Sequence, residues 1–403
     1  DTASNSSTCF PTKRVGGRPM RFEFATATRI LFGPGTPSDV APAAAQLGGR
    51  VMVVTGRTVE RARPLLDDLA ARCVTTTPFS IRGEPSVDSV CQGSQTALAA
   101  GCEVIIGFGG GSALDAAKAI AALATNGCDP YPFLEVIGAG QPLTAPPLPL
   151  IAVPTTAGTG AEVTRNAVLY SPAHRVKVSL RSPMMLPRLA VIDPELTYEL
   201  PPDVTASTGL DALTQVLEPF VSVAANPLTD TFCREGLRRA AGALRRAYEN
   251  GRDAQAREDM ALVSLMGGLA LANAKLGAVH GFAAPIGGMF AAPHGAVCAR
   301  LLPFVMQANI RALKATQPES EALRRYREIA QILTGNEKAT ADDGAAWVLD
   351  LIRDFGIPGL SAYGLTTADL PVIVEEATKA SSMKGNPLPL TPQQLHEILA
   401  QAL

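Results

Sequence analysis

Long apolar runs are missing from this sequence of 403 residues. The most apolar stretches, such as 147–153 (PLPLIAV), are interrupted by Pro, Thr or Gly well before the ~18 residues that a membrane-spanning helix requires. Strong charge is missing too, because the net charge is −2 and the Lys and Arg residues are dispersed. Neither nucleic acid nor a membrane is therefore an expected partner, whereas small molecules and further copies of the chain are.

Paired cysteines are also missing. The seven cysteines stand alone, at positions 9, 73, 91, 102, 128, 233 and 298. Without a C-x-x-C pair, this pattern favours reduced thiols over a disulfide framework or a zinc–thiolate site, and it predicts a cytoplasmic protein. Residues 1–20 lack the apolar segment of a signal peptide. We expect them to be a disordered polar tail or an expression remnant, outside the fold.

From residue 22 to about residue 196, short β-branched runs alternate with alanine-rich runs of helical spacing. The strand-like runs are 50–56, 102–111, 149–156 and 189–196, and the helical runs are 59–73, 87–101 and 112–127. Repeated strand–helix units predict a parallel sheet with helices on its faces. Ligands of such sheets bind at the carboxyl ends of the strands.

After residue 201 the strand signals stop, and helical patterns with Gly or Pro breaks continue. The Pro-rich stretch 193–203 marks the predicted boundary. We therefore predict an α/β domain over 21–197, an all-helical domain over 198–403, and a site in the cleft between them.

A glycine cluster in "VIIGFGGGSALDAAKAIA" separates a buried strand from a helix, at Gly109, Gly110, Gly111 and Ser112. Glycines let the backbone approach a ligand, and the free N–H groups of a helix start attract phosphate. The spacing is neither G-x-G-x-x-G nor that of a P-loop. A tight turn without a ligand remains the alternative.

A second polar loop, "PTTAGTGAEVT", follows another buried strand and offers Thr155, Thr156 and Thr159. Hydroxyl and amide groups at a strand's carboxyl end suit the polar parts of a dinucleotide. An ordinary Ser/Thr-rich loop is the alternative.

A third cluster has the residue types of a metal site. Asp211 and Gln215 stand four residues apart, on one face of a predicted helix, and "VHGFAAPIGGMFAAPHG" contributes His280 and His294. Two imidazoles and a carboxylate make an open site for a divalent catalytic metal. The other two histidines, His174 and His396, are expected on the surface.

Five ordered blocks resemble the iron-containing, or group III, alcohol dehydrogenases, a family related to glycerol dehydrogenase and dehydroquinate synthase. The blocks are GGGSALDAAKA, PTTAGTGAEVT, KVSLRSPMMLPRLAVIDPELTYELPP, TGLDALTQVLEPFVSVAANPLTD and GAVHGFAAPIGGMFAAPHGAVCARLLP. The resemblance implies a dehydroquinate synthase-like fold, with NAD or NADP on the α/β domain and Fe²⁺ or Zn²⁺ on the helical domain. It also implies a homodimer.

Carried over position by position, the resemblance implies that Asp211, Gln215, His280 and His294 ligate the metal and that Asp211, His280 and His294 serve catalysis. Two positions depart from the family pattern. Gln215 stands where the family usually has a third histidine, and its carbonyl oxygen is a weaker and harder ligand. Ala284 stands where the family commonly has a histidine beside the substrate.

The cofactor contacts implied by the resemblance add Asp115 and Lys177 to the glycines and threonines. After the strand 50–55, Gly56 stands where NAD-preferring members tend to carry an aspartate, and Arg57 follows it. Without that carboxylate a 2′-phosphate is not repelled, and Arg57 can pair with it. The alternatives are a solvated turn residue at Arg57 and an exposed hairpin lysine at Lys177.

We therefore expect a metal-dependent NAD(P)-linked oxidoreductase that interconverts an alcohol and an aldehyde or ketone. Two alternatives stay open at this point. One is a keto-acid reductase similar to maleylacetate reductase, with weak or no metal dependence. The other is a nucleotide-binding relative that has lost its chemistry.

Overall fold

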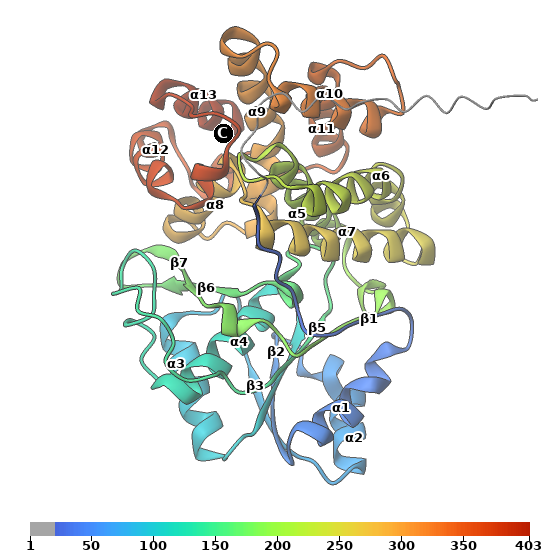
Figure 1. Ribbon diagram of the computed structural model, residues 1–403, viewed down its shortest axis with the longest axis vertical. Helices are drawn as coiled ribbons and strands as arrows, with labels where there is room; N and C mark the ends of the chain where they lie inside the picture. The colour runs from blue at the N-terminus through green and yellow to red at the C-terminus, as the bar shows by residue number, and fades with distance from the viewer. Residues whose placement is uncertain (1–20) are drawn as a thin grey trace, which may run out of the picture.

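The computed structural model describes residues 21–403, so the predicted tail of residues 1–20 lies outside the described residues. Figure 1 shows two stacked halves, with the sheet and its helices below and a bundle of helices above. A strand-rich half followed by a helical half is the architecture expected from the sequence.

The lower half is built on a six-stranded sheet in which every pairing is parallel. In spatial order the strands are β1 (Ile30–Phe32), β8 (Leu189–Ile192), β5 (Leu150–Pro154), β4 (Val104–Gly109), β2 (Arg50–Thr55) and β3 (Thr75–Ser80). The four strand-like runs of the sequence became β2, β4, β5 and β8. The edge strands β1 and β3 gave no such signal, because neither carries the continuous apolar run of a strand buried on both faces.

Four helices cover this sheet, and a separate two-stranded antiparallel hairpin packs on the outer side of one of them. The helices are α1 (Val40–Leu47), α2 (Arg63–Ala71), α3 (Val87–Ala99) and α4 (Gly111–Asn126), and the hairpin is β6 (Asn166–Ser171) with β7 (Val176–Arg181). The alanine-rich helix α4 is buried along most of its length. Its small side chains let it pack between the sheet and the hairpin.

Nine helices form the upper half (Figure 1). They are α5 (Pro202–Val221), α6 (Pro227–Glu249), α7 (Ala254–Asn273), α8 (Ala278–Met289), α9 (His294–Thr316), α10 (Glu321–Thr334), α11 (Ala341–Asp354), α12 (Leu370–Lys379) and α13 (Pro392–Ala402). Fifteen of the twenty residues of α5 are buried, so this helix lies in the middle of the helical core.

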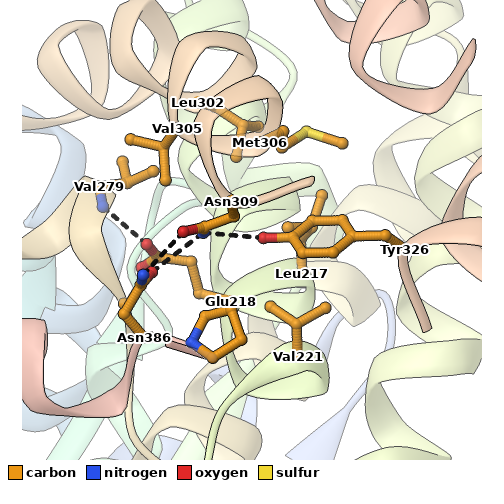
Figure 2. Close-up of a pocket in the computed structure, with 12 residues that line it drawn as sticks. Leu217, Glu218, Val221, Val279, Leu302, Val305, Met306, Asn309, Tyr326 and Asn386 are labelled. Carbon is orange, nitrogen blue, oxygen red and sulfur yellow. Dashed lines mark hydrogen bonds between the residues drawn. The ribbon is translucent and has the colours of Figure 1, made fainter. Parts of the chain in front are cut away.

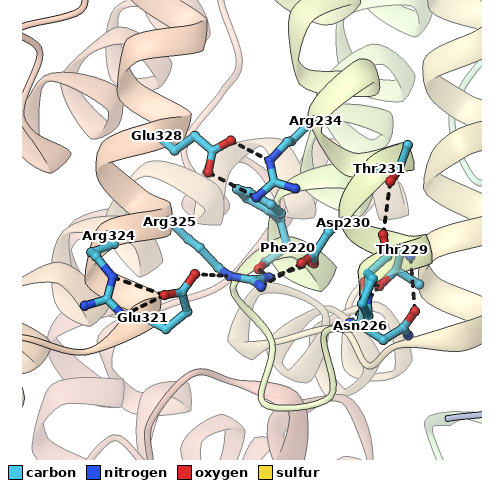
Figure 3. Close-up of polar contacts among 11 residues, drawn as sticks. Phe220, Asn226, Thr229, Asp230, Thr231, Arg234, Glu321, Arg324, Arg325 and Glu328 are labelled. Atoms are coloured by element: carbon cyan, nitrogen blue, oxygen red, sulfur yellow. Dashed lines mark hydrogen bonds and ion pairs between the residues drawn. The ribbon is translucent and has the colours of Figure 1, made fainter. Parts of the chain in front are cut away.

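An ion-pair network fastens α6 to α10 at the end of α5 (Figure 3). Arg325 donates to both carboxylate oxygens of Asp230 at 2.7 Å and to the carbonyl oxygen of Phe220 at 2.6 Å. A second pair joins Arg234 to Glu328 at 2.5 Å. Both guanidinium groups lie over the Phe220 ring, 4.9 and 5.0 Å from its centre. The network thus fixes the C-terminal end of α5, the helix that carries Asp211.

The segment before β1 belongs by its contacts to the helical half. The Phe24 ring stacks on Phe232 of α6 with centroids 5.9 Å apart, and the carbonyl oxygen of Ala25 accepts from the Asn273 side chain at 2.8 Å. This segment runs past α7 on its way down to the sheet (Figure 1). It therefore helps to hold the two halves together.

No single helix within residues 21–403 is long and apolar enough to cross a membrane. The pair α7 and α8 reaches that length and composition only together, with a bend of 96° between them.

Candidate functional site

The predicted cofactor residues lie at the carboxyl ends of neighbouring strands. Gly56 and Arg57 follow β2, while residues 109–112 end β4 and open α4. β3 pairs with one side of β2, and β4 pairs with the other side. The strand order therefore reverses between β2 and β4. Ligands of open parallel sheets bind at such a reversal.

The glycines at this reversal leave room that side chains would fill. A β-carbon at Gly109 would lie 3.4 Å from the backbone nitrogen of Gly56, and one at Gly111 would lie 2.8 Å from Cγ2 of Thr159. The N-cap of α4, Gly110, makes no side-chain cap hydrogen bond. The amides of Gly111 and Ser112 have no hydrogen-bond partner among the described residues, so they are available to a phosphate that approaches over the glycines.

The second predicted loop faces the first. The backbone N–H of Thr155 donates to the carbonyl oxygen of Gly109 at 3.0 Å. A β-carbon at Gly110 would lie 3.2 Å from Cγ2 of Thr156. The structure thus brings both glycine- and threonine-rich loops to one place, as a shared dinucleotide site requires.

Asp115 is held inside the α/β domain. One carboxylate oxygen lies 2.8 Å from Nζ of Lys118, and the other accepts the N–H of Val168 at 3.0 Å. Lys118 is 1% exposed and also donates to the Thr164 hydroxyl at 2.9 Å. These contacts tie α4 to the β6–β7 hairpin, and the expected cofactor contact of Asp115 stays a prediction.

Lys177 is a buried residue on β7 rather than an exposed hairpin lysine. It is 7% exposed and pairs with Glu84 at 2.7 Å. A β-carbon at Gly287 of α8 would lie 2.4 Å from its Nζ, so the lysine lies against the helical half. Arg57, in contrast, is exposed.

The histidines fall into two groups. His174 and His396 are exposed, as expected. His280 on α8 and His294 at the start of α9 converge on Asp211 of α5. Their Nε2 atoms lie 3.5 and 3.8 Å from Oδ1 of Asp211. Three segments that are far apart in sequence therefore meet at one carboxylate oxygen.

Asp211 fits a cation. It is 1% exposed, and among the described residues its Oδ1 has no hydrogen-bond partner. Burial alone raises the pKa of Asp211, but His294 and His280 outweigh burial and bring this pKa below its ordinary value. A buried carboxylate oxygen without a partner is costly. A divalent metal held with the two imidazoles would satisfy it.

The pKa values of the two histidines are shifted by the same charges. Burial alone lowers the pKa of His294, but the Cys298 sulfur and the Asp211 carboxylate outweigh burial and raise this pKa to about 9. The pKa of His280 lies well above its ordinary value because Cys298, Asp211 and Glu218 likewise outweigh burial. The site therefore stabilises positive charge.

Gln215 uses its amide nitrogen inside the protein. This nitrogen donates to the carbonyl oxygen of Gly158 at 2.7 Å and lies 3.3 Å from Oδ2 of Asp211. The first contact ties the second cofactor loop to α5. The second leaves Oδ1 of Asp211 free, and ligation by the Gln215 oxygen stays a prediction.

Glu218 was missed by the sequence reasoning. Its carboxylate accepts the N–H of Val279 at 2.7 Å and contacts Nδ1 of His280 at 2.7 Å. Glu218 belongs to α5, but its carboxylate lies beside the N-terminal end of α8. There it also offsets the partial positive charge of that helix end. A contact at Nδ1 directs Nε2 of His280 toward Asp211, as carboxylate partners of metal-bound histidines do.

A buried polar network continues behind Glu218 (Figure 2). The Asn309 side chain exchanges hydrogen bonds with Asn386 at 3.0 and 2.7 Å and donates to the Tyr326 hydroxyl at 3.0 Å. The cavity that these residues line with Glu218 measures ≈ 10 Å³, room for about one water molecule. Dense packing therefore holds Glu218 in place.

Cys298 was missed as well. Its sulfur lies 3.6 Å from Nε2 of His294 and 3.9 Å from Nε2 of His280. With Asp211 these residues form a group whose ligand atoms all lie within 4.8 Å of one another. The sequence held one signal for it, since residues 294 and 298 are four apart at the start of a helix and share a face.

Close approaches join the two halves around these groups. Gly160, at φ +59°, lies against Gly268 of α7, where an added β-carbon would be 2.4 Å from the Gly268 Cα. Only glycine accepts both that conformation and that distance. Ala284 lies one turn after His280 on α8 and is half-buried. The second predicted cofactor loop therefore packs directly against the helical half.

Comparison with known proteins gives matches along almost the whole chain. The model of the iron-containing alcohol dehydrogenases matches residues 27–194, and that of the C-terminal region of the Fe-containing alcohol dehydrogenase family matches residues 205–403. Alcohol dehydrogenase 4 of Schizosaccharomyces pombe is 37% identical over 324 residues, which cover 80% of this chain and 74% of that protein.

Solved structures agree. The crystal structure of 1,3-propanediol oxidoreductase superposes with a TM-score of 0.88 at 33% identity, covering 95% of this chain and 100% of that one. Sulfoacetaldehyde reductase from Bifidobacterium kashiwanohense, in complex with NAD⁺, superposes with a TM-score of 0.83 at 28% identity, covering 95% and 99%.

These matches confirm the resemblance, the two-part fold and the expected class of activity, an oxidoreductase that acts on alcohol and carbonyl groups. The expected pairing of a nicotinamide cofactor with a metal is confirmed at the level of the family. The chain belongs to the iron-containing alcohol dehydrogenase family.

Proposed function

We propose that this protein transfers hydride between NAD(P) and a small alcohol or aldehyde in the cleft between its two halves. The observation that carries the proposal is the buried Oδ1 of Asp211, which has no hydrogen-bond partner within residues 21–403 and faces two imidazoles. The glycine cradle at the ends of β2 and β4 supports the cofactor part. The retained donor set favours this function over a metal-independent keto-acid reductase or a relative without chemistry.

Each group in the cleft has a part in the proposal. Asp211, His280 and His294 would hold the metal, and the first-turn amides of α4 would bind the pyrophosphate. When bound, the metal supplies a Lewis acid for the substrate oxygen, and the nicotinamide supplies or accepts the hydride. With the metal bound, Glu218 would keep the proton at Nδ1 of His280, so that Nε2 can offer its lone pair as a ligand.

The substrate part of the proposal rests on Ala284. An alanine in place of a histidine removes a titrating group and widens the cleft one turn from His280. We infer that a branched or bulkier alcohol than ethanol is the better substrate. 1,3-Propanediol and sulfoacetaldehyde, taken from the names of the relatives, are the first compounds to test.

Other finer points of the proposal rest on the sequence. Gly56 and Arg57 favour acceptance of NADP beside NAD, since no acidic residue stands directly after β2, at positions 56 to 59, to repel a 2′-phosphate. Zn²⁺ is proposed beside Fe²⁺, and a homodimer in the cytoplasm completes the assignment. The six cysteines within the described residues are free thiols, which supports a reducing compartment.

The deciding experiment measures metal and nucleotide binding separately from turnover. Protein purified without oxygen and reconstituted with Fe²⁺ or Zn²⁺ should hold about one equivalent by elemental analysis, and His280→Ala should hold far less. Calorimetric titration of both proteins with NAD(H) should give similar affinities, because His280 lies on the helical half. Equal metal content in parent and variant would refute the site.

A further inference from the structure

The metal-facing group contains a donor that the family resemblance does not supply. Cys298 is fully buried, and its sulfur is directed at the same point as the two imidazoles and Asp211. His294 and Cys298 occupy the first and second turns of α9, so one helix presents both. Oδ1 of Asp211 is buried and has no hydrogen-bond partner among the described residues, and it independently marks that point as a cation site.

The spacing of the donors suits a tetrahedral ion. Bonds of about 2.0–2.1 Å to nitrogen or oxygen and 2.3 Å to sulfur put tetrahedral donor atoms about 3.3–3.6 Å apart. The two imidazole nitrogens lie 3.5 and 3.8 Å from Asp211 Oδ1 and 3.9 and 3.6 Å from the Cys298 sulfur. All four ligand atoms lie within 4.8 Å of one another, so modest side-chain movements would close the site.

Gln215 leaves a ligand position that the sulfur can fill. The family usually has an imidazole at position 215, whereas Gln215 here is held by Gly158 and Asp211 through its nitrogen. A neutral amide oxygen is also the weaker donor for a borderline-soft metal. Cys298, on α9, offers the strong donor that position 215 lacks.

We propose that Cys298 binds the metal as a thiolate and that this ligand makes the site select Zn²⁺ over Fe²⁺. The proposal rests on the metal site of the proposed function. On binding, the sulfur–metal bond forms and the thiol proton leaves to water, so the site releases one proton more than the same Asp and His ligands would without Cys298. The absence of a C-x-x-C pair argued against a metal–thiolate site, but a single cysteine can supply the thiolate here.

Cobalt substitution tests the ligand directly, because Co²⁺ bound to thiolate has a sulfur-to-metal charge-transfer band in the near ultraviolet. Co²⁺ is to be added to metal-free protein, with Cys298→Ser as the variant and Cys233→Ser as the matched control. Cys233 is a fully buried free thiol of α6, in the same helical core. We expect the band in the parent and in the control, and none in Cys298→Ser.

Metal competition then tests selectivity. Parent protein offered equal Zn²⁺ and Fe²⁺ without oxygen should bind mostly Zn²⁺, and Cys298→Ser should lower the Zn²⁺-over-Fe²⁺ preference by about tenfold or more. If Cys298→Ser does not fold, X-ray absorption of the zinc-loaded parent decides alone, since a sulfur ligand gives scattering at about 2.3 Å.

The outcomes separate the two proposals. One equivalent of Co²⁺ without the band, or zinc without a sulfur neighbour, overturns the role of Cys298 and leaves the Asp211–His280–His294 site standing. No metal bound to the folded parent overturns both. An unchanged preference in Cys298→Ser overturns the selectivity.

Discussion

Replacing Glu218 with glutamine should weaken metal binding about 10- to 100-fold, which corresponds to about 1.4–2.7 kcal/mol. The Glu218 side chain is 4% exposed and contacts Nδ1 of His280, itself 8% exposed, at 2.7 Å. Since little water screens this contact, we expect a loss near the upper end of the range. Glutamine keeps the shape and one acceptor oxygen but loses the charge that orients the imidazole and raises its basicity.

The assay is competition between the protein and a chromogenic chelator for Zn²⁺, with the free energy of unfolding measured in parallel. Glu218→Gln also weakens the hydrogen bond from Val279 to the carboxylate, which should lower the free energy of unfolding by about 1.5–3 kcal/mol. Asp230→Asn is the matched control, because Asp230 is a buried carboxylate of α6 that pairs with Arg325 away from the histidines. It should destabilise the fold and leave the zinc affinity of the folded protein unchanged.

Equal zinc affinities of Glu218→Gln and the parent would refute the orienting role of Glu218. Equal losses of zinc affinity in Glu218→Gln and Asp230→Asn would refute it too, because general loosening of the helical half would then explain both.

Three further results are expected. Arg325→Ala should lower the free energy of unfolding in urea by about 3–5 kcal/mol, because it leaves Asp230 buried and unpaired, whereas exposed Arg324→Ala should change it by less than about 0.5 kcal/mol; equal effects would contradict the burial argument. Burial raises the pKa of Glu162 to about 7. The folded protein therefore binds this proton more tightly than the unfolded chain, and stability is lost as the pH rises from about 4.3 through about 7. Glu162→Gln should remove that loss. If the urea midpoint of the variant fell with pH as steeply as that of the parent over this range, the assignment to Glu162 would be wrong. Gly56→Asp should shift the ratio of NADP to NAD affinity, measured by calorimetry, at least tenfold toward NAD, and a parent that binds no NADP would refute the premise.

Local signals were enough for most of the framework. The buried strands β2, β4, β5 and β8 could be predicted because a central parallel strand is apolar on both faces and ends in turn residues. The short, half-buried β1 and the largely exposed β3 could not. Their strand conformation depends on a neighbour that only the assembled sheet provides.

The ligand candidates divide in the same way. Asp211, His280 and His294 could be chosen from the sequence because their residue types and their surrounding blocks match a known pattern. In the sequence, Cys298 was one isolated cysteine among seven, and Glu218 was one acidic residue on a predicted helix. What sets them apart is the packing of α8 and α9 against α5, which brings one beside Nδ1 of His280 and the other beside Nε2.

By itself the sequence determined the order of strands and helices, the glycine turns and the family, because these depend on periodicity and on residues close together along the chain. Only the tertiary structure decided which donors meet. It turned the nitrogen of Gln215 to Gly158 and buried Lys177 against α8. It also left Oδ1 of Asp211 without a hydrogen-bond partner in the part of the chain that the structure describes. Such contacts join residues tens to hundreds of positions apart, so they follow from how helices and loops pack in three dimensions and not from any local pattern.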